Sequence, residues 1–238
     1  MRLLPIFAAM RKEEFQQLLA QTTIKPVVPL APGDKLLRMN LTAENAALNA
    51  ETFTSTERFS AWVEDLLHRK GARYGVGGWN EHRNIYARSE KFDTGEEPRR
   101  LHLGIDIWGP AGTPVFAPLD GTVHSVAIND FFGDYGGTVI LRHEVNGVVF
   151  HTLYGHLSHD STKGKAAGQG IAAGTQIATF GIPEENGQWP PHLHFQVIIN
   201  MQGKKGDYHG VCRYSQREQW LENCPDADVI LGLMGRAV

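Results

Sequence analysis

The sequence predicts a mainly β protein, with a compact antiparallel β domain at residues 101–200 and a partly helical region before it. From residue 101 onward, apolar runs of strand length alternate with glycine-containing turns. The 238 residues include 26 glycines and 12 prolines, which favours strands and turns over a helical bundle. Asn146-Gly147 lies between two apolar runs, and this dipeptide is the strongest short-range signal of a β-hairpin.

Helical patterns occur mainly before residue 101. Residues 11–21 carry apolar side chains at positions i, i+3 and i+4, so they are predicted to form an amphipathic helix. The prolines of residues 24–34 indicate an extended linker. Residues 55–70 repeat apolar side chains at helical spacing and predict a second helix, with Gly71 beyond it as the C-cap.

The predicted strands of the β domain are residues 101–108, 113–117, 121–128, 137–144, 147–153, 176–180 and 192–199. A hairpin is expected within residues 137–157, and one short helix at 216–223. We therefore divide the chain into an N-terminal region of unknown role (1–100), the β domain (101–200) and a C-terminal extension (201–238).

Composition argues against several functional classes. The net charge of −3 gives no electrostatic basis for binding nucleic acid. No stretch reaches the roughly 18 apolar residues of a membrane span. The apolar run at the N-terminus is short and has no small-residue cleavage site, so we expect no signal peptide and a cytoplasmic location. The spacing of Cys212 and Cys224 fits neither a zinc ribbon nor a disulfide framework, and we expect buried, reduced thiols.

Two short patterns offer metal ligands. His192 and His194 share one face of a strand, because side chains alternate between faces. By the same rule His102, Gly104 and Asp106 point together, and Gly104 is expected to leave space for an ion. Together with either His192 or His194, His102 and Asp106 supply two neutral nitrogens and a carboxylate, and this set of ligands suits zinc better than calcium or magnesium. Surface histidines and a His–Asp hydrogen bond would produce the same patterns.

Three motifs occur in order along the chain: His102-x-x-x-Asp106, Tyr154-Gly155-His156-Leu157 and His192-x-His194. Together they resemble the lysostaphin/LytM-type zinc metalloendopeptidases, which cut peptide bonds in bacterial peptidoglycan. The resemblance covers about residues 101–200. It implies a distorted antiparallel β-sandwich of the duplicated-hybrid-motif type, with one zinc ion bound by His102, Asp106 and His194. It also implies that His156 and His192 are catalytic.

The resemblance implies a zinc-dependent endopeptidase that hydrolyses peptidoglycan-like peptides by attack of a metal-activated water. Its partner would be a stem or cross-bridge peptide, and the sequence carries no signal for an oligomeric state. Two alternatives stay open: a non-catalytic binding or scaffold protein with a zinc site, and a hydrolase of a non-cell-wall peptide or amide. Family members usually act outside the cytoplasm, so a periplasmic or extracellular location is the alternative to a cytoplasmic one.

Several residues near the motifs are candidates for the substrate groove. Tyr154 and Trp189 are predicted contacts for a peptide, with core packing or loop anchoring as the alternative. The loops at residues 129–136 and 183–190 are predicted to form groove walls. The polar and aromatic segment at residues 80–88 is predicted to supply an occluding side chain or a substrate contact.

Overall fold

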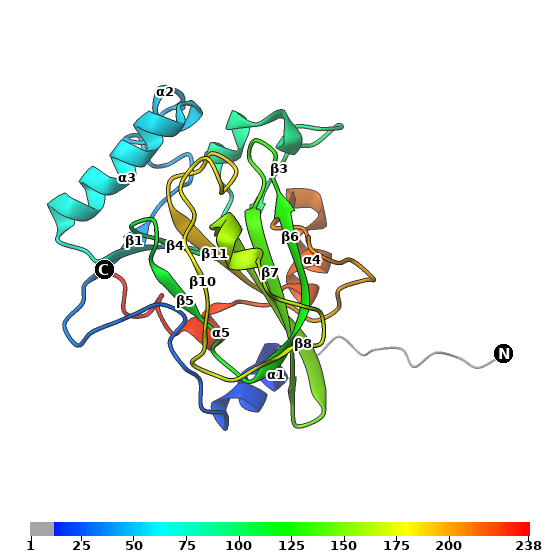
Figure 1. The fold of residues 1–238 in the computed structure, drawn as a ribbon. Coiled ribbons are helices and arrows are strands. Elements are labelled where there is room, and N and C mark those ends of the chain that lie inside the picture. The colour runs from blue at the N-terminus through cyan, green and yellow to red at the C-terminus, as the bar shows by residue number, and fades with distance from the viewer. Residues whose placement is uncertain (1–11) are drawn as a thin grey trace.

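The computed structural model describes residues 12–238, which form one large sheet, two small sheets and a set of surrounding helices (Figure 1). The strands are β1 (Leu36–Met39), β2 (Tyr74–Gly77), β3 (Arg99–His102), β4 (Ile105–Trp108), β5 (Pro114–Phe116), β6 (Gly121–Asn129), β7 (Gly136–Val145), β8 (Val148–Leu157), β9 (Gly170–Ile171), β10 (Gln176–Thr179), β11 (His192–Ile198) and β12 (Val211–Arg213). The α-helices are α1 (Lys12–Ala20), α2 (Ala50–Thr54), α3 (Thr56–Lys70), α4 (Arg217–Asn223) and α5 (Asp228–Leu231). Short 3₁₀ helices are η1 (Asn84–Arg88), η2 (Glu90–Phe92), η3 (His159–Thr162) and η4 (Tyr214–Gln216).

The large sheet has the strand order β1-β2-β4-β11-β8-β7-β6-β9. Its neighbouring strands are antiparallel, except for the parallel pair β1 and β2. The two small sheets pair β5 with β10 and β3 with β12. The predicted mainly β, antiparallel fold is therefore confirmed, and most of its strands form one large sheet.

Strands β7 and β8 form the predicted hairpin. Asn146 and Gly147 connect them with φ values of 50° and 79°, as the tight turn of a two-residue hairpin loop requires. Val145 pairs with Val148 on either side of this turn. The hairpin places β8 beside β11, the strand that carries His194.

The predicted strand at residues 101–108 is wrong in one respect: the chain forms two strands, β3 and β4, that belong to different sheets. The backbone leaves the extended pairing at Leu103, whose N–H donates to Gly210 O at 2.9 Å. Strand β3 therefore pairs with β12, whereas β4 pairs with β11 and β2. His102 and Asp106 consequently do not share the face of one strand.

Helix α3 lies beside the β1–β2 end of the large sheet (Figure 1). Ser55 caps its first turn, because its Oγ accepts the N–H of Arg58 at 3.2 Å. The predicted C-cap is present: Gly71 has a left-handed backbone with φ 58°. Phe59 is fully buried and packs against Trp108 of β4, with 5.9 Å between ring centroids. The helix is thereby held on the strand that carries Asp106.

The main hydrophobic core occupies one face of the large sheet. Ile105 and Ile107 of β4, Leu193 and Phe195 of β11, and Tyr154 of β8 are all fully buried in it. Side chains from α1, α5 and the β5–β10 sheet complete this cluster. Because side chains alternate along a strand, the residues between these positions project from the opposite face. The candidate metal centre lies on that opposite face.

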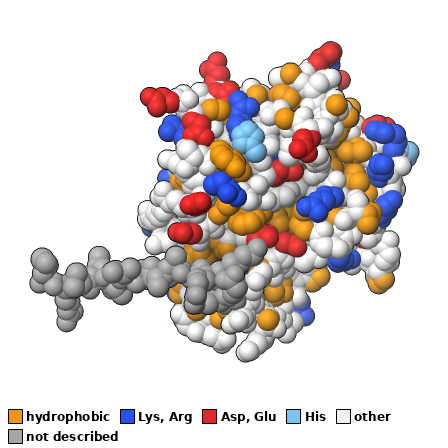
Figure 2. Space-filling view, turned by 180° about the vertical axis from the view of Figure 1, so that it is seen from behind, with side chains coloured by type: hydrophobic (Ala, Val, Ile, Leu, Met, Phe, Trp, Pro, Cys, Tyr) orange, Lys and Arg blue, Asp and Glu red, His pale blue; other side chains and the backbone are white. Residues whose placement is uncertain are grey.

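Segments from outside the predicted β domain contribute to the sheets. Strands β1 and β2 precede residue 101 and extend the large sheet, while β12 follows residue 200. The division into three regions stays a prediction. Among residues 12–238, no helix is long and apolar enough to cross a membrane. On the face shown in Figure 2, acidic and basic side chains are interspersed with hydrophobic ones.

Candidate metal centre

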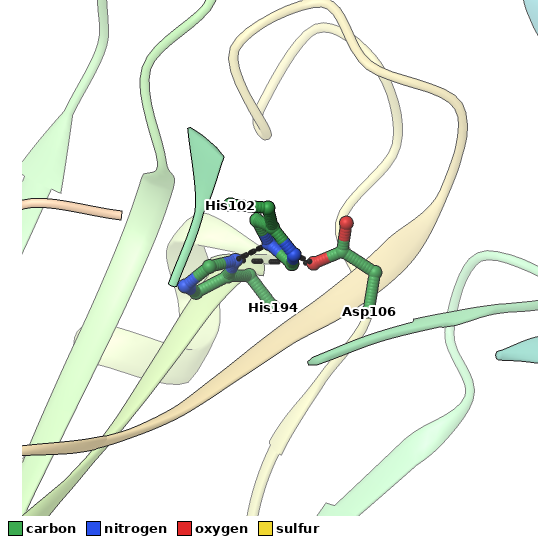
Figure 3. A group of neighbouring side chains, drawn as sticks. All are labelled: His102, Asp106 and His194. Carbon is green, nitrogen blue, oxygen red and sulfur yellow. Dashed lines mark hydrogen bonds and ion pairs between the residues drawn. The ribbon is translucent and has the colours of Figure 1, made fainter. Parts of the chain in front are cut away.

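Three buried side chains with metal-binding atoms converge at the large sheet (Figure 3). Asp106 of β4 pairs directly with His194 of β11, and His102 ends the neighbouring strand β3. His194 Nδ1 lies 2.9 Å from His102 Nε2 and 3.0 Å from Asp106 Oδ1. His102 Nε2 lies 3.3 Å from the same carboxylate oxygen. The structure thus brings together the three side chains that the sequence predicts as ligands.

This triangle of donor atoms has the size of one face of a zinc coordination tetrahedron. Zinc–ligand distances of about 2.0–2.1 Å place the donors of a tetrahedral site about 3.3 Å apart. The three observed separations, 2.9, 3.0 and 3.3 Å, are close to that value. Two imidazole nitrogens and a carboxylate oxygen also form a donor set of catalytic zinc sites, in which a fourth position stays open. The residues therefore fit zinc.

His102 is held in the tautomer that a metal ligand needs. Its Nδ1–H donates to the carbonyl oxygen of Gly78 at 3.0 Å, so the lone pair is on Nε2. Burial, aided by the nearby Arg83 charge, lowers the pKa of His102 to about 4. The imidazole is therefore neutral at physiological pH, as metal binding requires.

His194 is oriented by a second hydrogen bond on its far side. Its Nε2–H donates to Gln196 Oε1 at 2.9 Å, which leaves Nδ1 as the ligand atom. The amide of Gln196 is itself fixed, because its Nε2 donates to His209 O at 3.0 Å and to Cys224 Sγ at 3.2 Å. These donors determine which way the Gln196 oxygen points.

Asp106 is ionised although it is buried. Burial alone would raise its pKa, but His102 and the Arg83 guanidinium outweigh that effect and lower the pKa of Asp106 well below its usual range. Arg83 Nη1 donates to Asp106 Oδ2 at 2.5 Å. The carboxylate is thus available as an anionic ligand through Oδ1.

Gly104 has a different role from the one predicted. A Cβ at this position would lie 2.7 Å from both Cε1 and Nε2 of His194. The space beside Gly104 is therefore filled by a ligand ring, and the expectation that it leaves room for an ion is wrong. The glycine allows His194 to approach the β3–β4 turn.

The two histidines expected to be catalytic lie side by side next to the donor triangle. The rings of His156 and His192 have their centroids 4.1 Å apart. His156 Nδ1–H donates to Asn186 O at 2.8 Å, and His192 Nδ1–H donates to Pro190 O at 2.7 Å. Both Nε2 atoms therefore carry lone pairs in the neutral rings. Burial lowers the pKa of His192 to about 4 and holds that of His156 well below its usual range.

A pocket opens over these histidines and Asp106. Its walls are aromatic and charged, with contributions from Tyr86, Lys91, Phe92, Arg99, Asp134, Tyr135, Trp189 and Asp207. The two loops predicted as groove walls both take part, through residues 133–135 and through Trp189. Trp189 packs near His156, with 6.3 Å between ring centroids. It lies where a substrate contact was predicted, although only 3% of it is exposed.

Tyr154 does not line this pocket, and its prediction as a groove residue is wrong. It is fully buried in the main core, on the opposite face of the sheet. Its ring packs edge-on against Phe195 at 5.3 Å, and its hydroxyl accepts from Thr152 Oγ1 at 3.0 Å. Strand alternation explains this position: Gly155 pairs with His194 and lies on its face of the sheet, so the side chain of the preceding residue, Tyr154, points to the opposite face.

Sequence reasoning missed several residues that support the ligands. Gln196 could have been found, because it is two residues after His194 and so shares its face of β11. Arg83 lies in the segment 80–88 and contacts Asp106, while Tyr86 of the same segment lines the pocket. Tyr135, whose hydroxyl is 3.4 Å from His194 Nε2, had no distinctive signal within its loop.

Comparisons with known proteins find similar sequences among peptidases. Residues 100–207 match the family described as Peptidase family M23. A DD-carboxypeptidase/endopeptidase, Mpg, from Neisseria meningitidis is 37% identical over 131 residues, which are 53% of this chain and 28% of Mpg. The peptidoglycan DD-endopeptidase ShyC from Vibrio cholerae is 34% identical over 113 residues, 43% of this chain and 23% of ShyC.

A solved structure that resembles the chain is the catalytic domain of lysostaphin from Staphylococcus simulans, with 21% identity and a TM-score of 0.40. The match covers 68% of this chain and 96% of that domain. The curated relatives are much longer than their matched parts: the chain spans about a quarter of the length of Mpg and ShyC.

Proposed function

Residues 100–207 of the chain belong to peptidase family M23, and from this premise we propose that the protein is a zinc-dependent endopeptidase acting on peptidoglycan peptides. One zinc ion per chain would be held by His102, Asp106 and His194. The observation that carries the proposal is the buried triangle of donor atoms, with sides of 2.9–3.3 Å, beside two neutral histidines in a pocket.

Zinc bound at this site supplies Lewis acidity, which makes water a nucleophile near neutral pH and polarises a substrate carbonyl. The protein supplies the proton acceptors. His192 Nε2 carries a lone pair because Nδ1–H is engaged by Pro190 O, so we assign His192 as the general base. His156 Nε2 is also an acceptor, and it would orient the attacking water by accepting its second hydrogen.

After the attack, the protonated His192 becomes a donor. Its proton can then pass to the leaving amine, which completes the cleavage of the peptide bond. Trp108 supports this role, because its ring stacks on that of His192 with centroids 3.9 Å apart and planes inclined by 15°. The stack and the Pro190 hydrogen bond together fix the direction of Nε2.

The pocket favours a substrate that carries charges of both signs. Arg99 contributes a cationic group to its walls and Asp207 a carboxylate, beside the ion pair that Lys91 forms with Asp134. Peptidoglycan stem peptides carry both carboxylate and amino groups. The names of the two curated relatives support a bond between D-amino acids as the substrate, and we propose this class for the protein.

We place the proposed activity where peptidoglycan lies, outside the cytoplasm. This is the alternative location raised from the sequence, and it is favoured because ShyC is named a peptidoglycan endopeptidase. The expected cytoplasmic location has no support from the relatives and is not retained.

The test uses purified, zinc-loaded protein and defined muropeptides, with the products identified by mass spectrometry. Substrates with D,D cross-links and with glycyl bridges are compared. His192→Ala should lose turnover while it keeps one zinc ion per chain, and His194→Ala should lose both. His68→Ala, on the exposed surface of α3, is the matched control and should keep both.

Each result has a defined meaning. Zinc-loaded protein that binds muropeptides without cleaving them would favour a non-catalytic binding protein. Cleavage of other peptides or amides, but of no muropeptide, would favour a hydrolase with a non-wall substrate. Unchanged turnover in His192→Ala would show that the assignment of the general base is wrong.

A further inference from the structure

We propose that Arg83 is a positioning residue of the metal centre: by binding one oxygen of Asp106, it keeps the carboxylate a one-atom ligand and the fourth coordination position open. The inference rests on the proposed function, because it assumes that a metal ion binds to Asp106. Arg83 precedes residues 100–207, which match the peptidase family. The N-terminal region would therefore take part directly in the metal centre.

The two oxygens of Asp106 have different partners. Oδ1 faces the ligand nitrogens, at 3.0 Å from His194 Nδ1 and 3.3 Å from His102 Nε2. Oδ2 accepts the hydrogen bond from Arg83 Nη1 at 2.5 Å. A carboxylate whose second oxygen is bound by a guanidinium offers only one oxygen to an ion. Three one-atom ligands then leave the open position that a catalytic zinc site needs.

Arg83 is itself fixed on several sides and is fully buried. Its Nε donates to Glu81 Oε2 at 2.6 Å, and its backbone N–H donates to Arg100 O at 2.9 Å. Gly77 of β2 makes room for the side chain, since a Cβ there would lie 2.7 Å from Arg83 Nη2. The guanidinium donates in fixed directions, so the contact with Glu81 also directs Nη1 toward Asp106.

The segment around Arg83 also contacts His102, a second proposed ligand. The carbonyl of Gly78 accepts from His102 Nδ1 at 3.0 Å and lies 3.5 Å from Arg83 Nη2. The backbone N–H of His102 donates to Glu81 O at 2.9 Å. Residues 78–83 therefore contact the two ligands that come from β3 and β4. This arrangement fits a positioning role better than contact with a substrate, because the Arg83 side chain is 0% exposed.

The test replaces zinc with cobalt(II), whose visible absorption weakens when the coordination expands from four ligands to five. In Arg83→Met, Asp106 Oδ2 is released and can bind the metal, so we expect the absorption to fall about twofold or more. Arg83→Met alone leaves the buried Asp106 and the partly buried Glu81 without their cation. The double variant Arg83→Met/Glu81→Gln removes a charge of each sign and should show the same fall. Glu81→Gln alone is the matched control: its amide oxygen can still accept from Arg83 Nε, so Arg83 stays on Asp106 and the spectrum should not change.

Thermal unfolding of the metal-free proteins identifies the folded variants. A cobalt spectrum of wild-type intensity in the folded Arg83→Met variants would overturn the positioning role. Failure of the wild-type protein to bind cobalt or zinc would instead overturn the proposed function. The two failures are thus distinguished without any measurement of peptide cleavage.

Discussion

The substitution Gly104→Ala tests the packing of the metal centre most directly. The added Cβ would lie 2.7 Å from two atoms of the His194 ring and from the carbonyl oxygen of Phe195. Real Cβ contacts essentially never fall below 3.0 Å and ordinary contact begins at 3.4 Å, so a displacement of 0.3 Å is the minimum and 0.7 Å restores ordinary contact. The His194 ring is held by Gln196 and Asp106, and the Phe195 carbonyl is part of the central strand β11. The strain must therefore move His194, a proposed metal ligand, or the sheet itself.

Both movements have measurable consequences. Overpacking of this kind costs about 1–3 kcal/mol of unfolding free energy, which urea denaturation measures on the metal-free protein. Metal–ligand distances tolerate only about 0.2 Å, so we expect zinc affinity to fall roughly tenfold to a hundredfold in a chelator competition titration. Gly170→Ala is the matched control, because no heavy atom lies within 4 Å of its added Cβ. If Gly104→Ala bound zinc as tightly as Gly170→Ala, the close packing of His194 on this glycine would be refuted.

Three further predictions concern metal removal, hydrogen bonding and pH. If free zinc is held at about a hundred times its dissociation constant, adding a chelator should lower the melting temperature of the wild-type protein by roughly 5–10 °C in calorimetry. The His194→Ala variant should show no such change. Gln196→Leu removes the 2.9 Å acceptor of His194 Nε2–H and should weaken zinc binding about tenfold to a hundredfold. An unchanged affinity would show that this bond does not orient His194. His151 is 8% exposed, and burial lowers its pKa to about 4 in the folded protein, against about 6.5 in the unfolded chain. The folded protein therefore favours the neutral ring, and the stability that this ring contributes above pH 6.5 is lost as the pH falls toward 4. When the pH is lowered from 7 to 5, the wild type should lose about 1–2 kcal/mol more unfolding free energy than His151→Leu, as measured by urea denaturation.

Local patterns were sufficient to predict much of the β domain. The positive φ values of Asn146 and Gly147 follow from the turn that two such residues favour between strands, and the hairpin is present. Strand alternation correctly placed Leu193 and Phe195 in the core and His194 on the other face. These predictions depend only on the geometry of a few consecutive residues.

The failures arose where distant segments decide the structure. Strand β2 contains Gly75 and Gly77, whose missing side chains hide the alternation that identifies a strand. Both glycines are needed because Met39 and Arg83 occupy the space where a Cβ would lie, at 2.7 Å in each case. The break between β3 and β4 likewise depends on pairing of Leu103 with Gly210, far along the chain. No local sequence pattern contains these contacts.

The same reasoning explains how the proposed metal centre is built. The family-matched residues 100–207 supply all three donor atoms, but most of the groups that fix their directions lie outside this range. Gly78 and Arg83 orient two ligands from the N-terminal side. Gln196 orients the third, and its amide is held by Cys224 from the C-terminal side. Substitutions in these flanking segments should therefore affect metal binding more than they affect the β fold, because they change the orientation of the proposed ligands and not the packing of the core.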